Sequence, residues 1–345
     1  MQRPESFFDV PVEQQIERAT HAAHAALASY DFSAGALRLE LLKHRENTVF
    51  AVADSGDRRL GAMRVHVPGY QDRGSILSEF QWMEALNAAG VRTPGVVGAR
   101  DGALVIEVRV AETSESRLVD VLEWIEGRQP RDDEIVASFR ILGELQARCH
   151  NQASGWRLPP GFTRQRWDET TLLTGEHPTV APAWDNWALT TEERALVLDC
   201  RDALRDSLAR WGKGRDRYGI IHSDVMPENL IITNDEVRLI DFDDAGFGWY
   251  LYDPASALLP YHGSDLYETL LASWRAGYRL HRSLADEDLA ELPSFLLLRC
   301  FYALGWLHLR RNTDWAKAFI EPVRTLVAEL GAAFLRRSGG VTHLP

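Results

Sequence analysis

The fold is decided by the stretch Tyr218-Gly219-Ile220-Ile221-His222-Ser223-Asp224-Val225-Met226-Pro227-Glu228-Asn229. Its first four residues are mostly apolar and predict a short strand, and the residues that follow have the pattern His-x-Asp-x-x-x-x-Asn. This spacing alone is only suggestive, because three residue types at fixed positions also occur together by chance. The residues that come next make the pattern specific.

A second acidic motif follows a predicted β-hairpin made of residues 230–232 and 237–240. The motif is Asp241-Phe242-Asp243-Asp244. Two apolar strands therefore carry Asp224, Asn229 and Asp241 at their ends, in a geometry suited to holding Mg²⁺ and a nucleophilic hydroxyl together. The alternative, a hairpin with solvated acidic turns, is disfavoured because polar groups beside apolar strands need partners.

With these motifs the sequence resembles the aminoglycoside phosphotransferase-like family. Its members are relatives of protein kinases and include choline, homoserine and hydroxylysine kinases and a bacterial stress-response kinase. The resemblance covers nearly the whole chain. It implies an α+β, bilobal, protein-kinase-like fold, with an antiparallel-sheet N-terminal lobe that holds one key helix and a mainly helical C-terminal lobe. It also implies that Asp224 orients and deprotonates the acceptor hydroxyl, that Asn229 and Asp241 ligate the Mg²⁺ that bridges the ATP phosphates, and that His222 braces the loop.

The two expected lobes are residues 1–125, which bind the nucleotide, and residues 126–345, which carry catalysis and substrate binding. In the first lobe we expect a helix at 11–29, three strands within 36–67, a helix at 75–89 stopped by Gly90, and strands near 95–99, 103–109 and 117–125. In the second lobe we expect helices at 131–151, 191–213, 264–282 and 286–335. Residues 155–188 contain several prolines and four tryptophans, and we expect them to be an irregular insertion.

Two charged residues of the first lobe are expected to meet. Glu79 falls within the apolar stripe of the helix at 75–89, so its carboxylate faces inward and needs a cation. Alternation along the strand at 59–67 places Ala62 and Arg64 on one face, which makes Arg64 the candidate partner. Ala62-Met63-Arg64 resembles the Ala-Ile-Lys of kinases, which implies that Ala62 and Arg64 contact the nucleotide and that Arg64 binds its phosphates. The alternative is a salt bridge with no part in nucleotide binding.

Other nucleotide contacts are implied by position in the family. No Gly-x-Gly-x-x-Gly is present, and Glu46-Asn47-Thr48 occupies the place of the phosphate loop, so that the backbone of Asn47 would face the phosphates. The stretch at 122–127 resembles the segment that joins the two lobes in kinases. Backbone groups of Glu123 and Ile125 would hydrogen-bond to adenine there.

The sequence Tyr252-Asp253-Pro254-Ala255 has a plain structural explanation. We expect Asp253 to cap a helix and Pro254 to occupy the first helical position, so no catalytic role is assigned to either.

Several departures from protein kinases favour a small-molecule acceptor. The predicted helix cap at Asp253 comes only twelve residues after Asp241, which leaves no room for a long activation segment. Ser223 replaces an arginine that many protein kinases carry, and Met226 occupies the position of their catalytic-loop lysine. The expected reaction is therefore transfer of the ATP γ-phosphoryl group to a hydroxyl of a small molecule. A serine/threonine protein kinase of the stress-response type and a non-catalytic nucleotide-binding module are the alternatives.

The composition of the chain indicates which partners and which cellular compartment suit this reaction. The chain has 345 residues, and 38 lysines and arginines against 50 acids give a formal charge of −12. This sign disfavours nucleic acid and anionic membranes as partners and suits an acceptor that carries an amine. The three cysteines form no metal-binding or disulfide pattern. We found no signal peptide and no stretch able to span a bilayer, and we expect a cytoplasmic protein. Nothing in the sequence indicates an oligomeric state.

Overall fold

The structure is a computed structural model that describes Phe7 and residues 10–32, 35–45, 47–110, 115–177 and 179–338. Glu46, in the expected phosphate loop, lies outside these residues. The chain divides into two compact units. Unit 1 comprises residues 1–128, 159–163 and 233–240, and unit 2 comprises residues 129–158, 164–232 and 241–345. Two short segments that come later in the chain, residues 159–163 and 233–240, thus belong to unit 1.

Unit 1 is built on a five-stranded antiparallel sheet with the order β1-β2-β3-β5-β4. Its strands are β1 (Arg38–His44), β2 (Asn47–Ala53), β3 (Arg59–His66), β4 (Ile106–Arg109) and β5 (Ser116–Glu123). The three strands expected within 36–67 are confirmed. The prediction of a strand near 95–99 is wrong, because only an isolated β-bridge from Val96 to Leu122 forms there. The register of β3 and β5 places Arg64 opposite Asp120.

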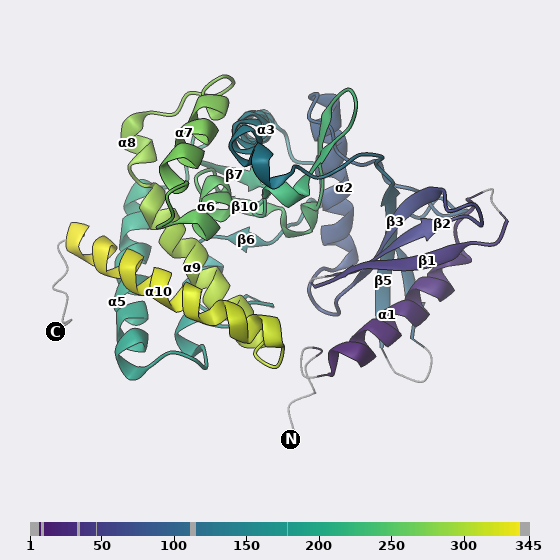
Figure 1. Ribbon diagram of the computed structural model, residues 1–345, viewed down its shortest axis with the longest axis horizontal. Helices are drawn as coiled ribbons and strands as arrows, with labels where there is room; N and C mark the ends of the chain where they lie inside the picture. Colours follow the sequence, from purple (N-terminus) through teal and green to yellow (C-terminus); the bar gives the residue numbers. More distant parts are fainter. Residues whose placement is uncertain are drawn as a thin grey trace. The chain divides into compact units, whose positions relative to one another are not determined.

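One helix covers each face of this sheet. Helix α1 (Val12–Leu27) is rich in alanine, which lets it pack closely on one face, as Figure 1 shows. Helix α2 (Arg73–Ala88) begins after Asp72, whose carboxylate accepts a hydrogen bond from the Ser75 backbone N–H at 2.7 Å. It ends near Gly90, which adopts a positive φ of 83°. The α2 residues Ile76, Phe80, Met83 and Leu86 are buried as expected, and so is Glu79.

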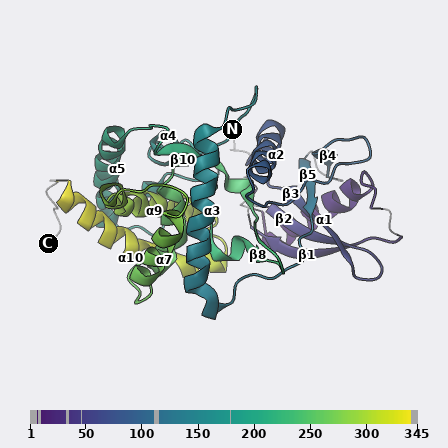
Figure 2. The same ribbon diagram turned by 90° about the horizontal axis from the view of Figure 1, so that it is seen from above.

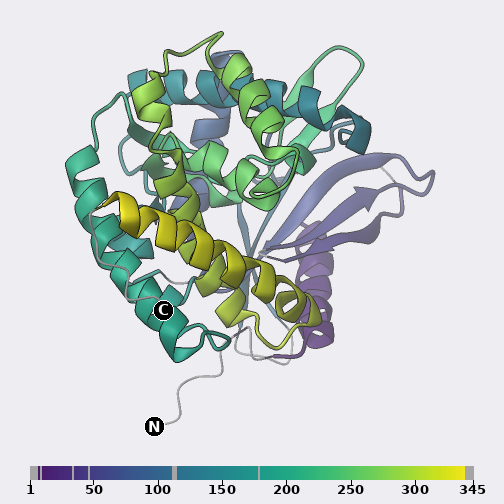
Figure 3. The ribbon, with the colours of Figure 1, turned by 60° about the vertical axis from the view of Figure 1, so that its left-hand side comes forward.

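Unit 2 is mainly helical. Its longer helices are α3 (Ile135–Gly155), α5 (Thr191–Trp211), α7 (Tyr267–Tyr278), α9 (Leu292–Leu309) and α10 (Asp314–Arg337). Helices α3 and α7 cross closely because each has a glycine at the contact: a Cβ on Gly143 would collide with the carbonyl of Trp274, and one on Gly277 with that of Arg140. Figure 2 shows the length of α3, and Figure 3 shows α10, in yellow, which packs on both α5 and α9.

The remaining elements of unit 2 are short. They are the short helices α4 (Glu169–Leu172), α6 (Tyr252–Leu258) and α8 (Asp286–Leu289) and a small sheet with the order β6-β10-β7. Its strands are β6 (Arg166–Trp167), β7 (Tyr218–Ile221) and β10 (Gly246–Trp249). The expectation that residues 155–188 are irregular is therefore wrong in part, because β6 lies inside that segment and pairs with β10 outside it. The predicted hairpin strands are present as β8 (Leu230–Ile232) and β9 (Val237–Leu239).

One stretch of the described residues, Asp286–Leu309, is long and apolar enough to cross a membrane by length and composition. The expectation that no stretch qualifies was wrong by this measure. About two thirds of its most apolar window is buried inside the protein (67%), and Phe295, Leu296 and Leu297 are almost fully buried. This burial is that of a helix in the core of unit 2.

Candidate active site

The first acidic motif forms a loop after β7 in which Asn229 holds Asp224. The Asn229 amide nitrogen donates a hydrogen bond to the Asp224 backbone carbonyl at 2.8 Å and lies 3.4 Å from its carboxylate oxygen Oδ2. Asn229 is 4% exposed, whereas the Asp224 side chain is 31% exposed. Because the amide nitrogen is engaged with Asp224, the amide oxygen lies on the opposite side of the group, where it can act as a ligand.

Asp253 fixes the backbone of this loop. Its fully buried carboxylate accepts hydrogen bonds from the backbone N–H of Ser223 at 2.7 Å and of His222 at 3.4 Å. Ser223 adopts a left-handed conformation with φ 72°, which an L-residue holds only where its surroundings fix it. The prediction that Asp253 caps a helix was wrong: α6 begins at Tyr252, and Asp253 lies within its first turn without capping it.

The Asp253 carboxylate is itself held by His150 on α3. The His150 Nε2 atom lies 2.8 Å from the carboxylate, and its Nδ1 lies 2.9 Å from the Tyr278 hydroxyl. Burial lowers the pKa of His150 below its ordinary value, although Asp253 acts in the opposite direction. A neutral imidazole then donates from Nε2 to Asp253 and accepts from Tyr278 at Nδ1. The loop at 222–223 and α3 therefore both contact the Asp253 carboxylate, and Tyr278 supports it through His150.

The second acidic motif lies against the first. The Phe242 ring packs on the His222 ring, with centroids 4.6 Å apart, so the segment that begins at Asp241 is next to the catalytic loop. Asp241 has a left-handed backbone with φ 67°. Arg164 supports the segment by donating to the backbone carbonyls of Asp243 at 2.5 Å and Ala245 at 2.6 Å. The sequence thus correctly predicted that the two motifs come together.

Arg299 is a further residue at this site that the sequence analysis missed. It lies on α9, and its guanidinium Nη2 is 3.0 Å from the Asp224 oxygen Oδ1. Its side chain is only 12% exposed. A single arginine in an otherwise apolar helix was a signal that could have been read, since a buried cation requires a partner.

The oxygen donors of unit 2 suit a hard divalent cation. Asn229 offers an amide oxygen and Asp241 a carboxylate, which are ligand types that Mg²⁺ prefers. Among the residues that the structure describes, no group of three or more His, Cys, Asp and Glu side chains is placed to hold a metal.

In unit 1 the expected pair of Arg64 and Glu79 is present at 2.7 Å. A second carboxylate, Asp120, receives two parallel hydrogen bonds from Arg64, from Nε and Nη2, both at 2.9 Å. His66 Nε2 lies 2.6 Å from the same carboxylate. Burial alone would raise the pKa of Asp120, but interactions with Arg64 and His66 hold it below its ordinary value. Asp120 was missed, although an acid within the apolar run at 118–122 was a visible signal.

This geometry predicts that Arg64→Lys will lower the free energy of unfolding by about 1–3 kcal/mol, because an ammonium cannot make the two parallel bonds to Asp120. Chemical denaturation of the variant measures the change. Arg59→Lys on the same strand is the control, since Arg59 is more exposed, pairs with Glu40 and should change by less than about 0.5 kcal/mol. Equal losses at the two positions would contradict the prediction.

The other residues of unit 1 that are expected to contact the nucleotide lie in β2, in β3 and at or just after the end of β5. Asn47 is the first residue of β2 and is 6% exposed, and Ala62 pairs with Ala51 and Leu122 inside the sheet. The Glu123 backbone N–H already donates to the Gly95 carbonyl at 2.7 Å. Of the backbone groups of Glu123, only the carbonyl is therefore left to bind adenine. The nucleotide roles of these residues and of Ile125 stay predictions.

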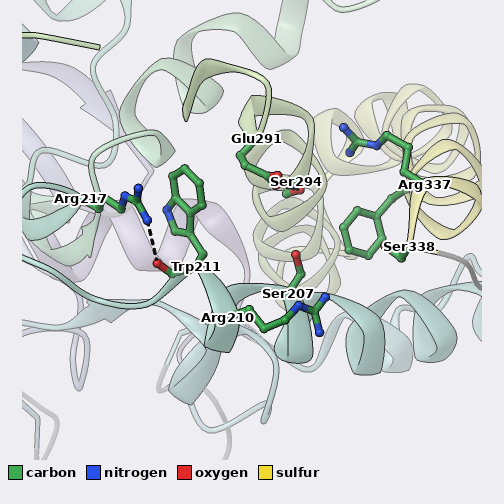
Figure 4. Close-up of a pocket in the computed structure, with 9 residues that line it drawn as sticks. Ser207, Arg210, Trp211, Arg217, Glu291, Ser294, Arg337 and Ser338 are labelled. Carbon is green, nitrogen blue, oxygen red and sulfur yellow. Dashed lines mark hydrogen bonds between the residues drawn. The ribbon is translucent and has the colours of Figure 1, made fainter. Parts of the chain in front are cut away.

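A separate cavity of about 360 Å³ lies in unit 2 and contains none of the expected site residues. It is lined by residues at the end of α5, the beginning of α9 and the end of α10, among them Trp211, Glu291 and Arg337 (Figure 4). Arg217 closes one side and donates to the Trp211 carbonyl at 3.2 Å.

Comparison with known proteins shows the family. Residues 38–292 match the sequence profile of the phosphotransferase enzyme family. The chain belongs to this family. The phosphotransferase has the protein-kinase-like fold expected from its sequence, with an antiparallel sheet in its first unit and a mainly helical second unit. It is a small-molecule kinase that acts on a hydroxyl group.

Individual relatives of the phosphotransferase are kinases of small molecules. A solved structure of a microcompartment-associated aminopropanol kinase is 33% identical, covers 92% of this chain and 98% of its own, and has a TM-score of 0.81. The amicoumacin kinase of Bacillus subtilis (strain 168) is 24% identical over 320 residues, which are 86% of this chain and 88% of its own. A structure of the amicoumacin kinase hAmiN with AMP-PNP, Ca²⁺ and Ami shares 22% identity over 94% and 96% of the two chains, with a TM-score of 0.74, and supports the fold.

Proposed function

We propose that this phosphotransferase uses Mg²⁺ and ATP to phosphorylate the hydroxyl group of a small amino alcohol. The observation that carries the proposal is the likeness to an aminopropanol kinase over nearly the full length of both chains, at 33% identity. The acidic character of the site supports it. Four aspartates occur in the two motifs, at 224, 241, 243 and 244, and the whole chain carries a formal charge of −12. An ammonium group on the acceptor complements this charge.

The chemistry assigned to unit 2 is general-base-assisted phosphoryl transfer. Asp224 accepts the proton of the acceptor hydroxyl while the hydroxyl oxygen forms a bond to the γ-phosphorus. The bond from the γ-phosphorus to the bridging oxygen breaks, and ADP leaves with the electron pair. Asn229 and Asp241 would hold the Mg²⁺, which when bound neutralises charge on the phosphate oxygens. Most of the rate enhancement then comes from positioning and electrostatics rather than from covalent chemistry.

In unit 1 we assign nucleotide binding to the group around Arg64. Its guanidinium is held by Glu79 and Asp120, so its charge is largely balanced before any phosphate binds. Arg64 would therefore act on the nucleotide from a fixed position instead of reaching for it as a mobile cation.

We also propose a cytoplasmic location. The supporting observation is that the three cysteines, Cys149, Cys200 and Cys300, are buried free thiols. Thiols that stay reduced are typical of proteins from reducing compartments.

The test is ADP release from Mg·ATP with a panel of acceptors: 1-amino-2-propanol, ethanolamine, choline, homoserine, hydroxylysine, an aminoglycoside, a neutral sugar and a generic protein acceptor. We expect kcat/KM to be largest for a small amino alcohol and to fall by at least about tenfold for the matched diol, which lacks the ammonium group. EDTA should abolish release. Preference for the diol or for protein would contradict the proposal.

A further inference from the structure

Asp224 is held directly by Asn229 and Arg299, and indirectly by Asp253 through the loop backbone. Only Arg299 acts on its carboxylate by charge. Asp253 fixes the loop backbone through Ser223 and His222. Asn229 holds the Asp224 backbone carbonyl at 2.8 Å, and its amide nitrogen also lies 3.4 Å from the carboxylate oxygen Oδ2. Arg299, which is 75 residues further along the chain, reaches the carboxylate oxygen Oδ1 at 3.0 Å.

Arg299 is itself held in place by two tyrosines. Its guanidinium carbon lies 4.1 Å from the centroid of the Tyr302 ring and 5.7 Å from that of Tyr252. Its Nη1 lies 3.5 Å from the Tyr252 hydroxyl oxygen. Burial acts to lower the pKa of Arg299, but Tyr252, Tyr302 and Asp224 outweigh it and the pKa is raised. The guanidinium therefore stays charged and is restricted to one orientation by stacking and by its carboxylate partner.

The cation of Arg299 lies beside a loop in which the lysine of protein kinases is replaced. Protein kinases carry a lysine two residues after the catalytic aspartate, and Met226 stands there in this chain. The loop thus lacks a cation of its own next to Asp224. Arg299 supplies a cation from α9 instead, on the Oδ1 side of the carboxylate.

We infer that Arg299 is a positioning residue for catalysis, which holds Asp224 by its Oδ1 atom so that Oδ2 is presented to the acceptor hydroxyl. This inference rests on the proposed function, because it gives Asp224 the role of general base. The guanidinium cancels part of the charge of the Asp224 carboxylate and prevents that carboxylate from pairing with the ammonium group of an amino alcohol instead of its hydroxyl. Other groups must then bind the ammonium.

The test compares Arg299 with the arginine at the C-terminal cap of the same helix. Arg310 is the matched control, because it ends α9, is 5% exposed and stacks on the Trp306 ring with a distance of 4.4 Å to the centroid. Arg299→Met and Arg310→Met should lose similar stability, whereas only Arg299→Met should lower kcat, by about 100-fold, with the acceptor KM within about threefold of wild type.

Rescue separates positioning from a structural role. In Arg299→Ala, added methylguanidine should raise kcat by at least about tenfold, because a free guanidinium can enter the space beside Tyr302 and pair with Asp224. Wild-type kcat in Arg299→Met, or a loss that methylguanidine does not restore in Arg299→Ala, would overturn the inference. If neither variant folds, Arg299→Lys decides: a kcat about tenfold below wild type with unchanged KM supports positioning, and wild-type kcat overturns it.

The outcomes also separate this inference from the proposed function. If the wild-type enzyme shows no acceptor-dependent ADP release, the proposed function fails. If wild type is active and Asp224→Asn is inactive while Arg299→Met keeps its kcat, only the role of Arg299 fails.

Discussion

Asp224→Asn is expected to lower kcat by about 10³-fold, because the amide cannot accept the proton of the acceptor hydroxyl. The substitution preserves the size of the side chain, and the contact of Asn229 with the Asp224 backbone carbonyl does not depend on the carboxylate. Nucleotide affinity should therefore change by less than about threefold. ADP release with the best acceptor and equilibrium binding of a fluorescent ATP analogue measure the two effects.

The control for this substitution is Asp202→Asn on α5. Asp202 also accepts hydrogen bonds from arginines, Arg201 at 2.9 Å and Arg205 at 3.1 Å, but it is exposed at the surface. The kcat of the Asp202→Asn variant should stay within about twofold of wild type. Turnover retained in Asp224→Asn would rule out Asp224 as the general base and with it the mechanism proposed for unit 2.

Asp253→Ala is expected to lower the free energy of unfolding by about 3–5 kcal/mol. The buried carboxylate accepts from the Ser223 and His222 backbone N–H groups and pairs with His150, and alanine would leave all three donors without this acceptor in the interior. Each such buried donor costs about 1–3 kcal/mol. Urea denaturation followed by tryptophan fluorescence measures the change.

Asp286→Ala provides the matched comparison for stability. Asp286 pairs with Arg279 at 2.6 Å and lies at the start of α8, but its side chain is 76% exposed. Its loss should cost less than about 1 kcal/mol. If Asp253→Ala is as stable as Asp286→Ala, the carboxylate of Asp253 is not what holds the catalytic loop.

Local sequence patterns predicted well the strands and loops that carry the two acidic motifs. His-x-Asp-x-x-x-x-Asn and the second acidic motif are short and bounded by apolar strands, so strand and loop could be assigned without knowledge of distant residues. The inward position of Glu79 followed from helical periodicity alone. The ion pair with Arg64 then followed from alternation along β3.

Residues that act through distant contacts were harder to predict. Arg299 meets Asp224 across 75 residues, and Asp120 meets Arg64 across 56. Both lie in apolar segments, which marks them as charges in need of partners but does not name the partners. Asp253 misled the analysis because Asp-Pro next to a helix start is a common capping pattern. Its long-range hydrogen bonds to the catalytic loop outweighed that local preference.

The contacts of Arg164 have a consequence for how such enzymes diverge. This arginine supports the Asp241 segment by donating hydrogen bonds to the backbone carbonyls of Phe242, Asp243 and Ala245. Trp167 likewise donates to the Asp244 carbonyl. Hydrogen bonds to main-chain carbonyls do not depend on the identity of the side chain on the accepting residue. The side chains after Asp241, and with them the surroundings of the acceptor, can therefore change during evolution while the backbone path of the segment stays the same.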